Sequence, residues 1–178
     1  LIELALEKLN GLASPMAVDL GTGSGIVAIS LALESPAAKI AAVDISEEAI
    51  FVARNNAGRL GASVDFFQGD WLAPLAGKRF DLIVSNPPYV AHGDPHLALN
   101  GLPFEPQLAL TDGADGLDCI RRIVADAPAH LNPGGWLLFE HGYDQGEASR
   151  NLLTAAGFKA AFTFPDLAGI DRVSGAHF

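Results

Sequence analysis

Two kinds of apolar segment alternate along this chain. One is a short continuous run of apolar residues, and in the other the apolar residues are spaced so that they share one face of a helix. This alternation is typical of a parallel sheet whose strands are joined by covering helices. The pattern predicts strands at 16–20, 39–43, 64–68, 81–85 and 136–140, with a closing pair at 158–164 and 172–178. It predicts helices at 26–33, 47–59, 117–127 and 145–156, and the apolar residues of 1–9 share one further helical face.

Local signals mark where several elements begin and end. Ser46 precedes Glu47 and Glu48, as expected of an N-cap followed by acidic residues in the first helical turn. Residues 132–135, Asn-Pro-Gly-Gly, are predicted to form a turn before the strand at 136–140. Residues 90–113 are rich in Pro, Gly, His and Asp and lack periodicity, so a functional loop such as a lid or a substrate-binding insert is expected there.

The composition predicts one soluble, cytoplasmic domain over residues 1–178. Of the 178 residues 49% are hydrophobic, enough to fill a core. No apolar run approaches the roughly 18 residues that a membrane span needs, and no secretory signal is recognisable. The single cysteine, Cys119, fits a reducing compartment and is expected to be an inert, partly buried thiol. Because the chain starts without methionine and within a helical pattern, we interpret it as a fragment.

The charge of the chain bears on its partners. Eleven basic residues face 21 acidic ones, giving a net charge of −10, and no basic run is present. Proteins that bind DNA or RNA non-specifically need a lysine and arginine surface to displace counterions from phosphates. Direct nucleic-acid binding by this domain is therefore disfavoured.

A glycine loop follows the first predicted strand. Gly21, Thr22, Gly23, Ser24 and Gly25 connect the strand at 16–20 to the next helix. Such a loop offers backbone N–H groups and a helix N-terminus to a ligand, and glycines allow close approach. The alternating glycines differ from the dinucleotide-binding spacing, so the loop alone is compatible with a plain tight turn.

The ends of the next two strands carry further candidates for ligand binding. Asp44 ends the second strand, where an acidic residue can accept hydrogen bonds from a ribose diol or cap the following helix. Asp70 and Trp71 follow the third strand, where a carboxylate could bind an exocyclic amine and an indole could pack on a purine. Trp71 as core filler is the alternative interpretation. All these residues fall at the carboxyl ends of strands, where open parallel sheets bind ligands.

The fourth strand leads into Asn86, Pro87, Pro88 and Tyr89. The side-chain oxygen of Asn86 and the carbonyl of Pro87 could accept hydrogen bonds from the two protons of an amide or amine nitrogen. These two oxygens would orient the lone pair of the nitrogen for attack on a methyl group. The two prolines restrict the backbone that carries these oxygens, and Tyr89 could stack on a planar substrate group. The alternative is that the four residues form only a rigid turn.

Together these motifs resemble the class I S-adenosylmethionine-dependent methyltransferases that modify amino groups. Three later stretches, Phe104-Glu105-Pro106, the Asn-Pro-Gly-Gly of 132–135 and Glu140-His141-Gly142, narrow the resemblance to the release factor glutamine methyltransferases, also called HemK or PrmC proteins. It covers essentially the whole chain. The resemblance implies a Rossmann-like α/β fold with a seven-stranded, mostly parallel sheet, an antiparallel last strand and helices on both faces.

The resemblance also implies an activity and a set of site residues. The expected reaction is methyl transfer from S-adenosylmethionine to the side-chain nitrogen of the glutamine in the Gly-Gly-Gln motif of peptide-chain release factors. The helical N-terminal domain that family members usually carry is expected to be absent from this chain. The expected cofactor-binding residues are Gly21, Thr22, Gly23, Ser24, Gly25, Asp44, Asp70, Trp71 and Asn86. The expected catalytic and substrate-binding residues are Asn86, Pro87, Pro88 and Tyr89.

Four other functions remain as alternatives to this one. A paralogue that methylates a ribosomal-protein glutamine would share every catalytic residue, and an adenine-N6 methyltransferase would share the acceptor chemistry but need a basic groove. A catalytically silent nucleotide-binding module would not need the Asn-Pro-Pro-Tyr sequence, and a nicotinamide enzyme would need a different glycine spacing.

A few polar residues outside these motifs are weaker candidates. The spacing of His92, Asp94 and His96 matches no common pattern of zinc ligands, so no metal site is expected. Glu140 and His141 follow a strand end and could either support the site or belong to a turn.

Overall fold

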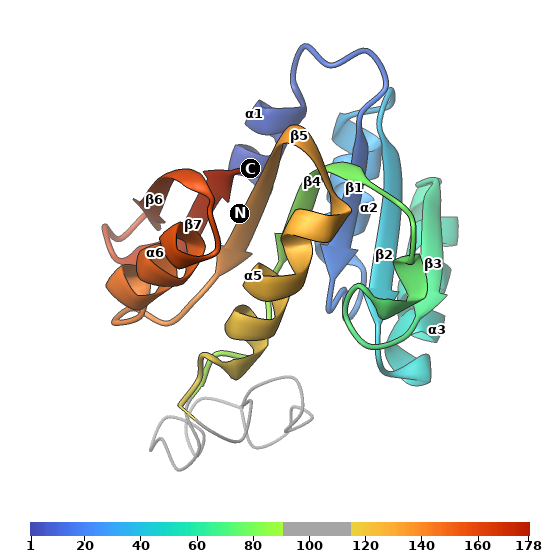
Figure 1. Ribbon diagram of the computed structural model, residues 1–178. Helices are drawn as coiled ribbons and strands as arrows, with labels where there is room; N and C mark the ends of the chain where they lie inside the picture. Colours follow the sequence, from blue (N-terminus) through green and yellow to red (C-terminus); the bar gives the residue numbers. More distant parts are fainter. Residues whose placement is uncertain (91–114) are drawn as a thin grey trace.

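The computed structural model describes residues 1–90 and 115–178 (Figure 1). The predicted helices and strands are all present among them. The strands are β1 Met16–Leu20, β2 Lys39–Asp44, β3 Val64–Gln68, β4 Phe80–Ser85, β5 Leu131–Glu140, β6 Lys159–Pro165 and β7 Asp171–His177. The helices are α1 Ile2–Leu9, α2 Ile26–Glu34, α3 Glu47–Leu60, α5 Asp118–His130 and α6 Gly146–Ala155, with a short 3-10 turn, η1, at Ala73–Leu75.

All seven strands form one sheet in the order β3-β2-β1-β4-β5-β7-β6. Strands β1 to β5 pair in parallel, whereas β7 is inserted between β5 and β6 and runs antiparallel to both. The predicted seven-stranded sheet with an antiparallel last strand is confirmed. Its two central parallel strands, β1 and β4, are neighbours although they are far apart in sequence.

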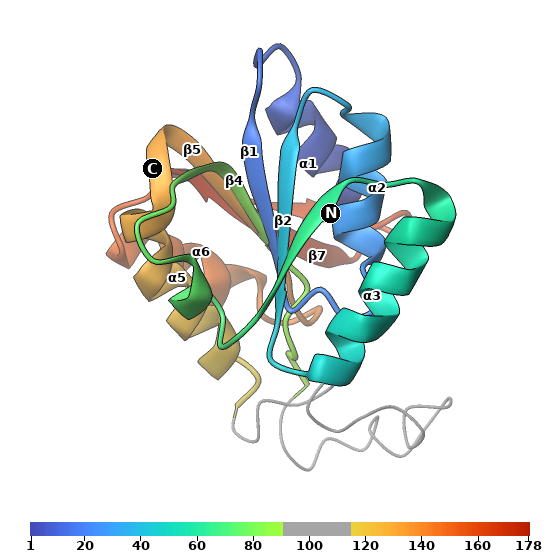
Figure 2. The ribbon, with the colours of Figure 1, turned by 90° about the vertical axis from the view of Figure 1, so that its right-hand side faces the viewer.

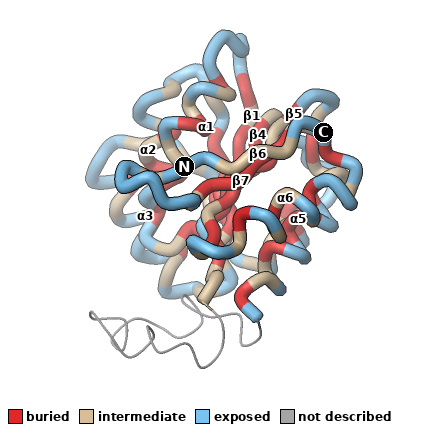
Figure 3. The backbone as a smooth tube through the Cα atoms, turned by 90° about the vertical axis from the view of Figure 1, so that its left-hand side faces the viewer, coloured by how far each residue is buried: buried red, intermediate tan, exposed pale blue. Residues whose placement is uncertain are grey.

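Helices cover both faces of the sheet, as predicted. In Figure 2, α1, α2 and α3 lie on one side of the strands and α5 and α6 on the other. Each face has its own buried apolar cluster, and Figure 3 shows the burial concentrated in the strands between the helical layers. Leu31 of α2 and Leu82 of β4 belong to one cluster, and Ile123 of α5 and Leu20 of β1 to the other.

The local signals explain the ends of α3. Ser46 is its N-cap, and the Ser46 hydroxyl accepts a hydrogen bond from the backbone N–H of Ala49 at 3.1 Å. Glu47 and Glu48 occupy the first turn, where their charges complement the helix dipole. Gly61 ends the helix with φ +72°, a left-handed conformation that glycine adopts without steric cost.

Two predicted boundaries differ from the structure by more than one residue. The strand predicted at 136–140 begins five residues earlier, at Leu131, and residues 132–135 form a bulge within it rather than a separate turn. Hydrogen bonds from distant parts of the chain hold this bulge: Asn132 donates to the Asp81 carboxylate at 2.7 Å, and the N–H of Gly134 donates to the Phe178 carbonyl at 2.8 Å. Helix α5 also continues through Pro128, whose fixed φ is compatible with a last helical turn.

No helix within 1–90 or 115–178 is both long enough and apolar enough to cross a membrane. The loop predicted at 90–113, with His92, Asp94, His96 and Glu105, lies outside the described residues apart from Val90.

We expect Gly175→Ala to lower the free energy of unfolding, whereas Gly58→Ala raises it. A Cβ at Gly175 of β7 would lie 2.3 Å from Cδ2 of Leu138 and 3.0 Å from the Leu137 carbonyl oxygen, so the Leu138 side chain or the pairing of β7 with β5 would have to shift. A Cβ at Gly58 of α3 would meet nothing within 4 Å. Urea denaturation should show a loss of about 1–3 kcal/mol for the first variant and a gain of about 0.5–1 kcal/mol for the second. Equal effects of the two substitutions would contradict this account of β7.

Candidate functional site

The candidate site lies where three parallel strands end at one edge of the sheet. The register places Leu20 of β1 beside Val43 of β2 and Ser85 of β4. The glycine loop, Asp44 and Asn86 therefore leave the sheet at the same level. Sequence reasoning predicted that the ends of β1, β2 and β3 meet at one edge, and the pairing of Leu20 with Val43 and of Asp44 with Gln68 confirms it.

The conformation of the glycine loop explains its alternating glycines. Gly21, Gly23 and Gly25 have φ values of +70°, +55° and +86°, in the left-handed region that favours glycine. The N–H groups of Gly21 and Thr22 both donate to the Val43 carbonyl, at 2.9 and 3.0 Å, which ties the loop to β2. A Cβ on Gly25 would lie 2.9 Å from Cδ1 of Ile29 and 3.1 Å from Cβ of Ala53, so this glycine also lets α2 and α3 pack closely. A Cβ on Gly23 would meet nothing within 4 Å, which leaves that backbone open to a ligand.

Asp44 holds the glycine loop in place. Its Oδ2 accepts a hydrogen bond from the Gly23 N–H at 2.8 Å, and its Oδ1 accepts one from the Ser46 N–H at 2.9 Å. The loop is braced from α3 as well, because the side-chain amide of Asn56 donates to the Ser24 carbonyl at 2.9 Å. Each carboxylate oxygen of Asp44 retains acceptor capacity, since a carboxylate offers about four lone-pair positions.

The structure gives Trp71 and Asp70 different surroundings. The Trp71 ring packs beside the loop, since a Cβ on Gly21 would lie 3.4 Å from its Cζ3. The backbone of Trp71 has φ +47°, an uncommon conformation for a residue with a side chain. The Asp70 carboxylate instead forms an ion pair with Arg122 of α5, in which both side chains are about half exposed. Trp71 therefore adjoins the glycine loop, whereas Asp70 faces α5.

The Asn-Pro-Pro-Tyr turn is tied to the glycine loop by a buried hydrogen bond. The hydroxyl of Ser85, which has no exposed surface, donates to the Leu20 carbonyl at 2.8 Å. Asn86 follows Ser85 and is exposed, whereas Pro87 is buried. The turn thus presents the Asn86 side chain at the surface, directly beside the strand that leads into the glycine loop. Sequence reasoning did not assign Ser85 a role.

Tyr89 connects the turn to the far half of the sheet. Its carbonyl accepts a hydrogen bond from the side-chain amide of Gln145 at 3.0 Å. Burial raises the pKa of the Tyr89 phenol, and the negative charge of Glu140 at the end of β5 raises it further. Tyr89 is therefore a neutral phenol at physiological pH, and Glu140 lies close enough to influence it.

Asp19, a buried carboxylate in β1, was not among the predicted site residues. Its Oδ2 accepts hydrogen bonds from the Thr22 hydroxyl at 2.6 Å and from the Ala28 N–H at 3.2 Å. Its Oδ1 is buried and has no hydrogen-bond partner among the described residues. Burial raises the pKa of Asp19 to about 6. The signal in the sequence was a charged residue inside an otherwise apolar strand.

His141, at the end of β5, lies in a buried polar chain. Its Nδ1 is 2.7 Å from the Gly142 carbonyl, which can only accept, so Nδ1 carries the proton. Its Nε2 then accepts from the Ser174 hydroxyl at 2.9 Å, and Ser174 in turn lies 2.9 Å from Thr163 Oγ1. Burial lowers the pKa of His141 and so favours this neutral form. His141 thus supports the main chain after β5.

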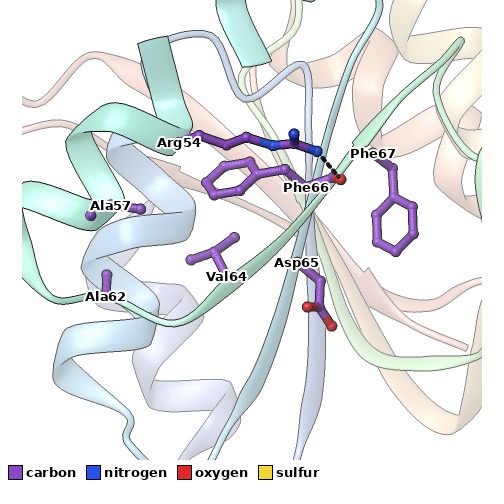
Figure 4. A pocket seen from close by; sticks show the side chains of 8 residues that line it. Arg54, Ala57, Ala62, Val64, Asp65, Phe66 and Phe67 are labelled. Carbon is purple, nitrogen blue, oxygen red and sulfur yellow. Dashed lines mark hydrogen bonds between the residues drawn. The ribbon is translucent and has the colours of Figure 1, made fainter. Parts of the chain in front are cut away.

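Two surface cavities lie away from the predicted cofactor loop and turn. The larger, of about 510 Å³, is formed by α3 and β3, where Arg54 donates to the Phe66 carbonyl at 3.1 Å (Figure 4). The smaller, of about 330 Å³, lies between η1 and α5 and includes Asp70 and Arg122. No cluster of three metal-ligating side chains is present in the described parts of the chain.

The model of one protein family, the methyltransferase small domain, matches residues 2–101, more than half of the chain. The chain belongs to this methyltransferase family. The matched region includes the glycine loop and the Asn-Pro-Pro-Tyr turn, two of the motifs on which the resemblance was based.

Several relatives of similar sequence are named release factor glutamine methyltransferase. The protein of that name from Bordetella pertussis is 52% identical over 178 residues, covering 99% of this chain and 66% of the relative. The one from Vibrio cholerae is 49% identical over 176 residues, covering 98% of this chain and 61% of the relative. The chain thus spans about two thirds of the length of the curated relatives that it matches. The predicted resemblance to this group is confirmed, although Phe104-Glu105-Pro106 lies outside the described residues.

Solved structures of lower sequence identity share the methyltransferase fold. A ribosomal protein L11 methylase from Lactobacillus delbrueckii subsp. bulgaricus has a TM-score of 0.67 at 22% identity, covering 99% of this chain and 74% of that one. A 16S rRNA N2 G1207 methyltransferase from Thermus thermophilus, in complex with AdoMet and guanosine, has a TM-score of 0.70 at 23% identity, covering 99% and 42%. These similarities confirm the predicted Rossmann-like architecture.

We expect Asp19→Asn to remove a pH-dependent part of the free energy of unfolding of this methyltransferase domain. The pKa of Asp19 is raised from 3.8 to about 6, so its contribution to stability is fully present below pH 3.8 and is lost as the pH rises through 6. Between pH 4 and pH 7.5 the variant should therefore gain about 2–2.5 kcal/mol relative to the wild type. Urea titrations at a series of pH values measure this difference. Asp65→Asn, at an exposed carboxylate, is the control, and a constant difference between Asp19→Asn and wild type would contradict the prediction.

Proposed function

We propose that this chain transfers a methyl group from S-adenosylmethionine to the side-chain amide nitrogen of the glutamine in the Gly-Gly-Gln motif of peptide-chain release factors. The observation that carries the proposal is the Ser85–Leu20 hydrogen bond, which joins the Asn-Pro-Pro-Tyr turn to the strand of the glycine loop. A cofactor site and an acceptor site are thereby adjacent at one sheet edge. The names of the relatives at about 50% identity support the choice of acceptor.

Several features of the loop suit S-adenosylmethionine. The Oδ1 of Asp19, which has no hydrogen-bond partner among the described residues, could accept a hydrogen bond from the ammonium group of a bound amino acid, and a nearby positive charge would lower the pKa of this carboxyl. The open backbone at Gly23, with Asp44 beside it, could receive a ribose, and the Trp71 ring next to Gly21 could pack against the cofactor. When bound, the cofactor would supply an electrophilic methyl group on a sulfonium.

The residues of the turn would prepare the acceptor nitrogen. An amide nitrogen is a poor nucleophile because its lone pair is delocalised into the carbonyl group. The side-chain oxygen of Asn86 and the carbonyl of Pro87 would accept its two N–H groups and so favour the geometry with a free lone pair. Neutral Tyr89 could stack on the planar amide. This scheme needs no basic side chain in the site, since the proton leaves after the nitrogen has become cationic.

The composition favours a protein acceptor over nucleic acid. The net charge of −10 and the absence of a basic run in the sequence disfavour adenine-N6 methylation of nucleic acid, which would need a basic groove. Release factors act in the cytoplasm, so we place the domain there, where a single cysteine would remain reduced. A ribosomal-protein glutamine would use the same chemistry, and only an assay with defined substrates separates the two acceptors.

Cofactor binding should be visible in the fluorescence of Trp71. The chain has two tryptophans, so Trp136→Phe leaves Trp71 as the single emitter. We expect titration with S-adenosylmethionine to change its emission, and Asp44→Ala to weaken the measured affinity about tenfold, because it removes both the brace of Gly23 and the proposed ribose acceptor. Asp65→Asn should leave the affinity unchanged. Binding of NADH without binding of S-adenosylmethionine would contradict the proposal.

Intact-mass analysis of a release factor tests the reaction itself. After incubation with the domain and S-adenosylmethionine, an unmodified factor should gain one methyl group, and the same factor with its Gly-Gly-Gln glutamine changed to alanine should gain none. Asn86→Ala should lower kcat at least about 100-fold, because it removes one of the two orienting acceptors. Asn55→Ala, at an exposed position of α3, is the matched control. If cofactor binds but the factor is not methylated, the release-factor acceptor is wrong, and ribosomal proteins are the next substrates to assay.

A further inference from the structure

We infer that Gln145 is a positioning residue for the proposed methyl transfer. Its side-chain amide anchors the main chain of the Asn-Pro-Pro-Tyr turn at Tyr89, and so fixes where the oxygens of Asn86 and Pro87 lie. The inference rests on the proposed function and deepens it. Gln145 is the N-cap residue of α6 and comes 56 positions after Tyr89, so no local pattern in the sequence connects the two.

The Gln145 amide joins three segments of main chain. Its Oε1 accepts from the Gly142 N–H at 2.8 Å, and its Nε2 donates to the carbonyls of Tyr89 at 3.0 Å and Gly116 at 3.3 Å. One partner can only donate and the other two can only accept, so the orientation of the amide is determined. Gln145 thereby holds together the turn after β4, the segment that leads into α5 and the end of β5.

The close approach of these segments also requires a glycine at position 116. Gly116 is buried and has φ +82°. A Cβ at this position would lie 2.4 Å from the Tyr89 carbonyl oxygen and 2.6 Å from Nε2 of Gln145. Any side chain at 116 would therefore push the two hydrogen-bonding partners apart. This observation supports the junction independently of the hydrogen bonds.

Gln145 is itself held by rigid elements. Its N–H donates to the Gly142 carbonyl at 3.0 Å, and its own carbonyl accepts from the Ser149 N–H at 2.9 Å in the first turn of α6. The Gly142 carbonyl also receives the Nδ1–H of His141, whose ring is buried and bonded to Ser174 of β7. The anchor therefore rests on the sheet and on α6, which suits a group that must fix another to within a fraction of an ångström.

The anchor can act on Asn86 because the turn has few free torsions. Proline fixes φ near −65°, so Pro87 and Pro88 leave little rotation between Asn86 and Tyr89. The Ser85 hydroxyl fixes the start of this stretch at 2.8 Å from the Leu20 carbonyl, and Gln145 fixes its end. With both ends held, the acceptor oxygens are pre-organised, and a displacement of about 1 Å can cost about 100-fold in rate.

Gln145→Glu is the decisive substitution, with Asn151→Asp as its matched control. The glutamate retains the shape and an acceptor for Gly142, but its carboxylate cannot donate to the two carbonyls. The control adds the same charge to an exposed position of the same helix. We expect kcat for release-factor methylation to fall about 10- to 100-fold with unchanged affinity for S-adenosylmethionine. The deficit should shrink as the pH falls, because the two facing carbonyls disfavour the ionised carboxylate and a protonated carboxyl regains an O–H donor.

A second measurement follows the turn without any substrate. The chain has two tyrosines, so 3-fluorotyrosine in a Tyr143→Phe background gives a single ¹⁹F signal, from Tyr89. Gln145→Glu and Gly116→Ala should both shift or broaden this signal, and Asn151→Asp should not. Thermal melts identify any variant that fails to fold, and Gln145→Met then serves as a second variant that lacks the donor.

The outcomes separate the two proposals. If the wild-type domain methylates the release factor and Gln145→Glu stays within twofold of it at all pH values, the positioning role is wrong. If the wild-type domain methylates no release factor, the proposed function fails, and the ¹⁹F signal alone decides whether Gln145 positions the turn. An unchanged Tyr89 signal in both Gln145→Glu and Gly116→Ala would overturn the inference. A shifted signal with a loss in kcat confined to the junction variants would support it.

Discussion

The parallel pairing of β1 and β4 fixes the geometry on which the site depends. Leu20 and Ser85 are register partners at the ends of these strands, and the buried Ser85 hydroxyl closes the pair by donating to the Leu20 carbonyl. Side chains of both strands are buried in the cores on the two faces of the sheet. A shift of the strand register by one residue would therefore move each of these side chains to the opposite face. Core packing therefore determines the level at which the glycine loop and the Asn-Pro-Pro-Tyr turn leave the sheet, before any loop residue contributes.

Asp19 shows how the same strand combines structural and ligand-binding demands. A carboxylate in this core is tolerated because the Thr22 hydroxyl and the Ala28 N–H donate to one of its oxygens. The other oxygen has no partner among the described residues, and burial raises the pKa of the group. A cationic ligand group at that oxygen would reduce the cost of the buried charge. A ligand bound in this way would restore stability that the buried charge costs the ligand-free domain, a trade-off that is common at functional sites.

The sequence predicted the features that depend on neighbouring residues and missed those that depend on distant ones. The bounds of β1 and β3 and the caps of α3 were predicted correctly, because apolar runs, Ser46 and Gly61 are local signals. The start of β5 was missed because the bulge at 132–135 is held by hydrogen bonds to Asp81 and Phe178. The glycine loop, Asp44 and the Asn-Pro-Pro-Tyr turn carry recognisable motifs. The Gln145–Tyr89 and Arg122–Asp70 contacts span 56 and 52 positions and carry none.

The third strand contributes to the site through Trp71 more than through Asp70. The ion pair of Asp70 with Arg122 is about half exposed on both sides, and exposed ion pairs contribute at most about 1 kcal/mol to stability. The Asp70 carboxylate could therefore exchange its ion pair with Arg122 for a hydrogen bond from a ligand amine. Nothing in this pair, however, directs the carboxylate towards the glycine loop. Trp71 adopts a positive φ of +47°, a conformation that is kept only where its surroundings require it, and its ring lies beside Gly21. The uncommon backbone conformation of Trp71 thus places an aromatic surface against the loop that the cofactor is proposed to occupy.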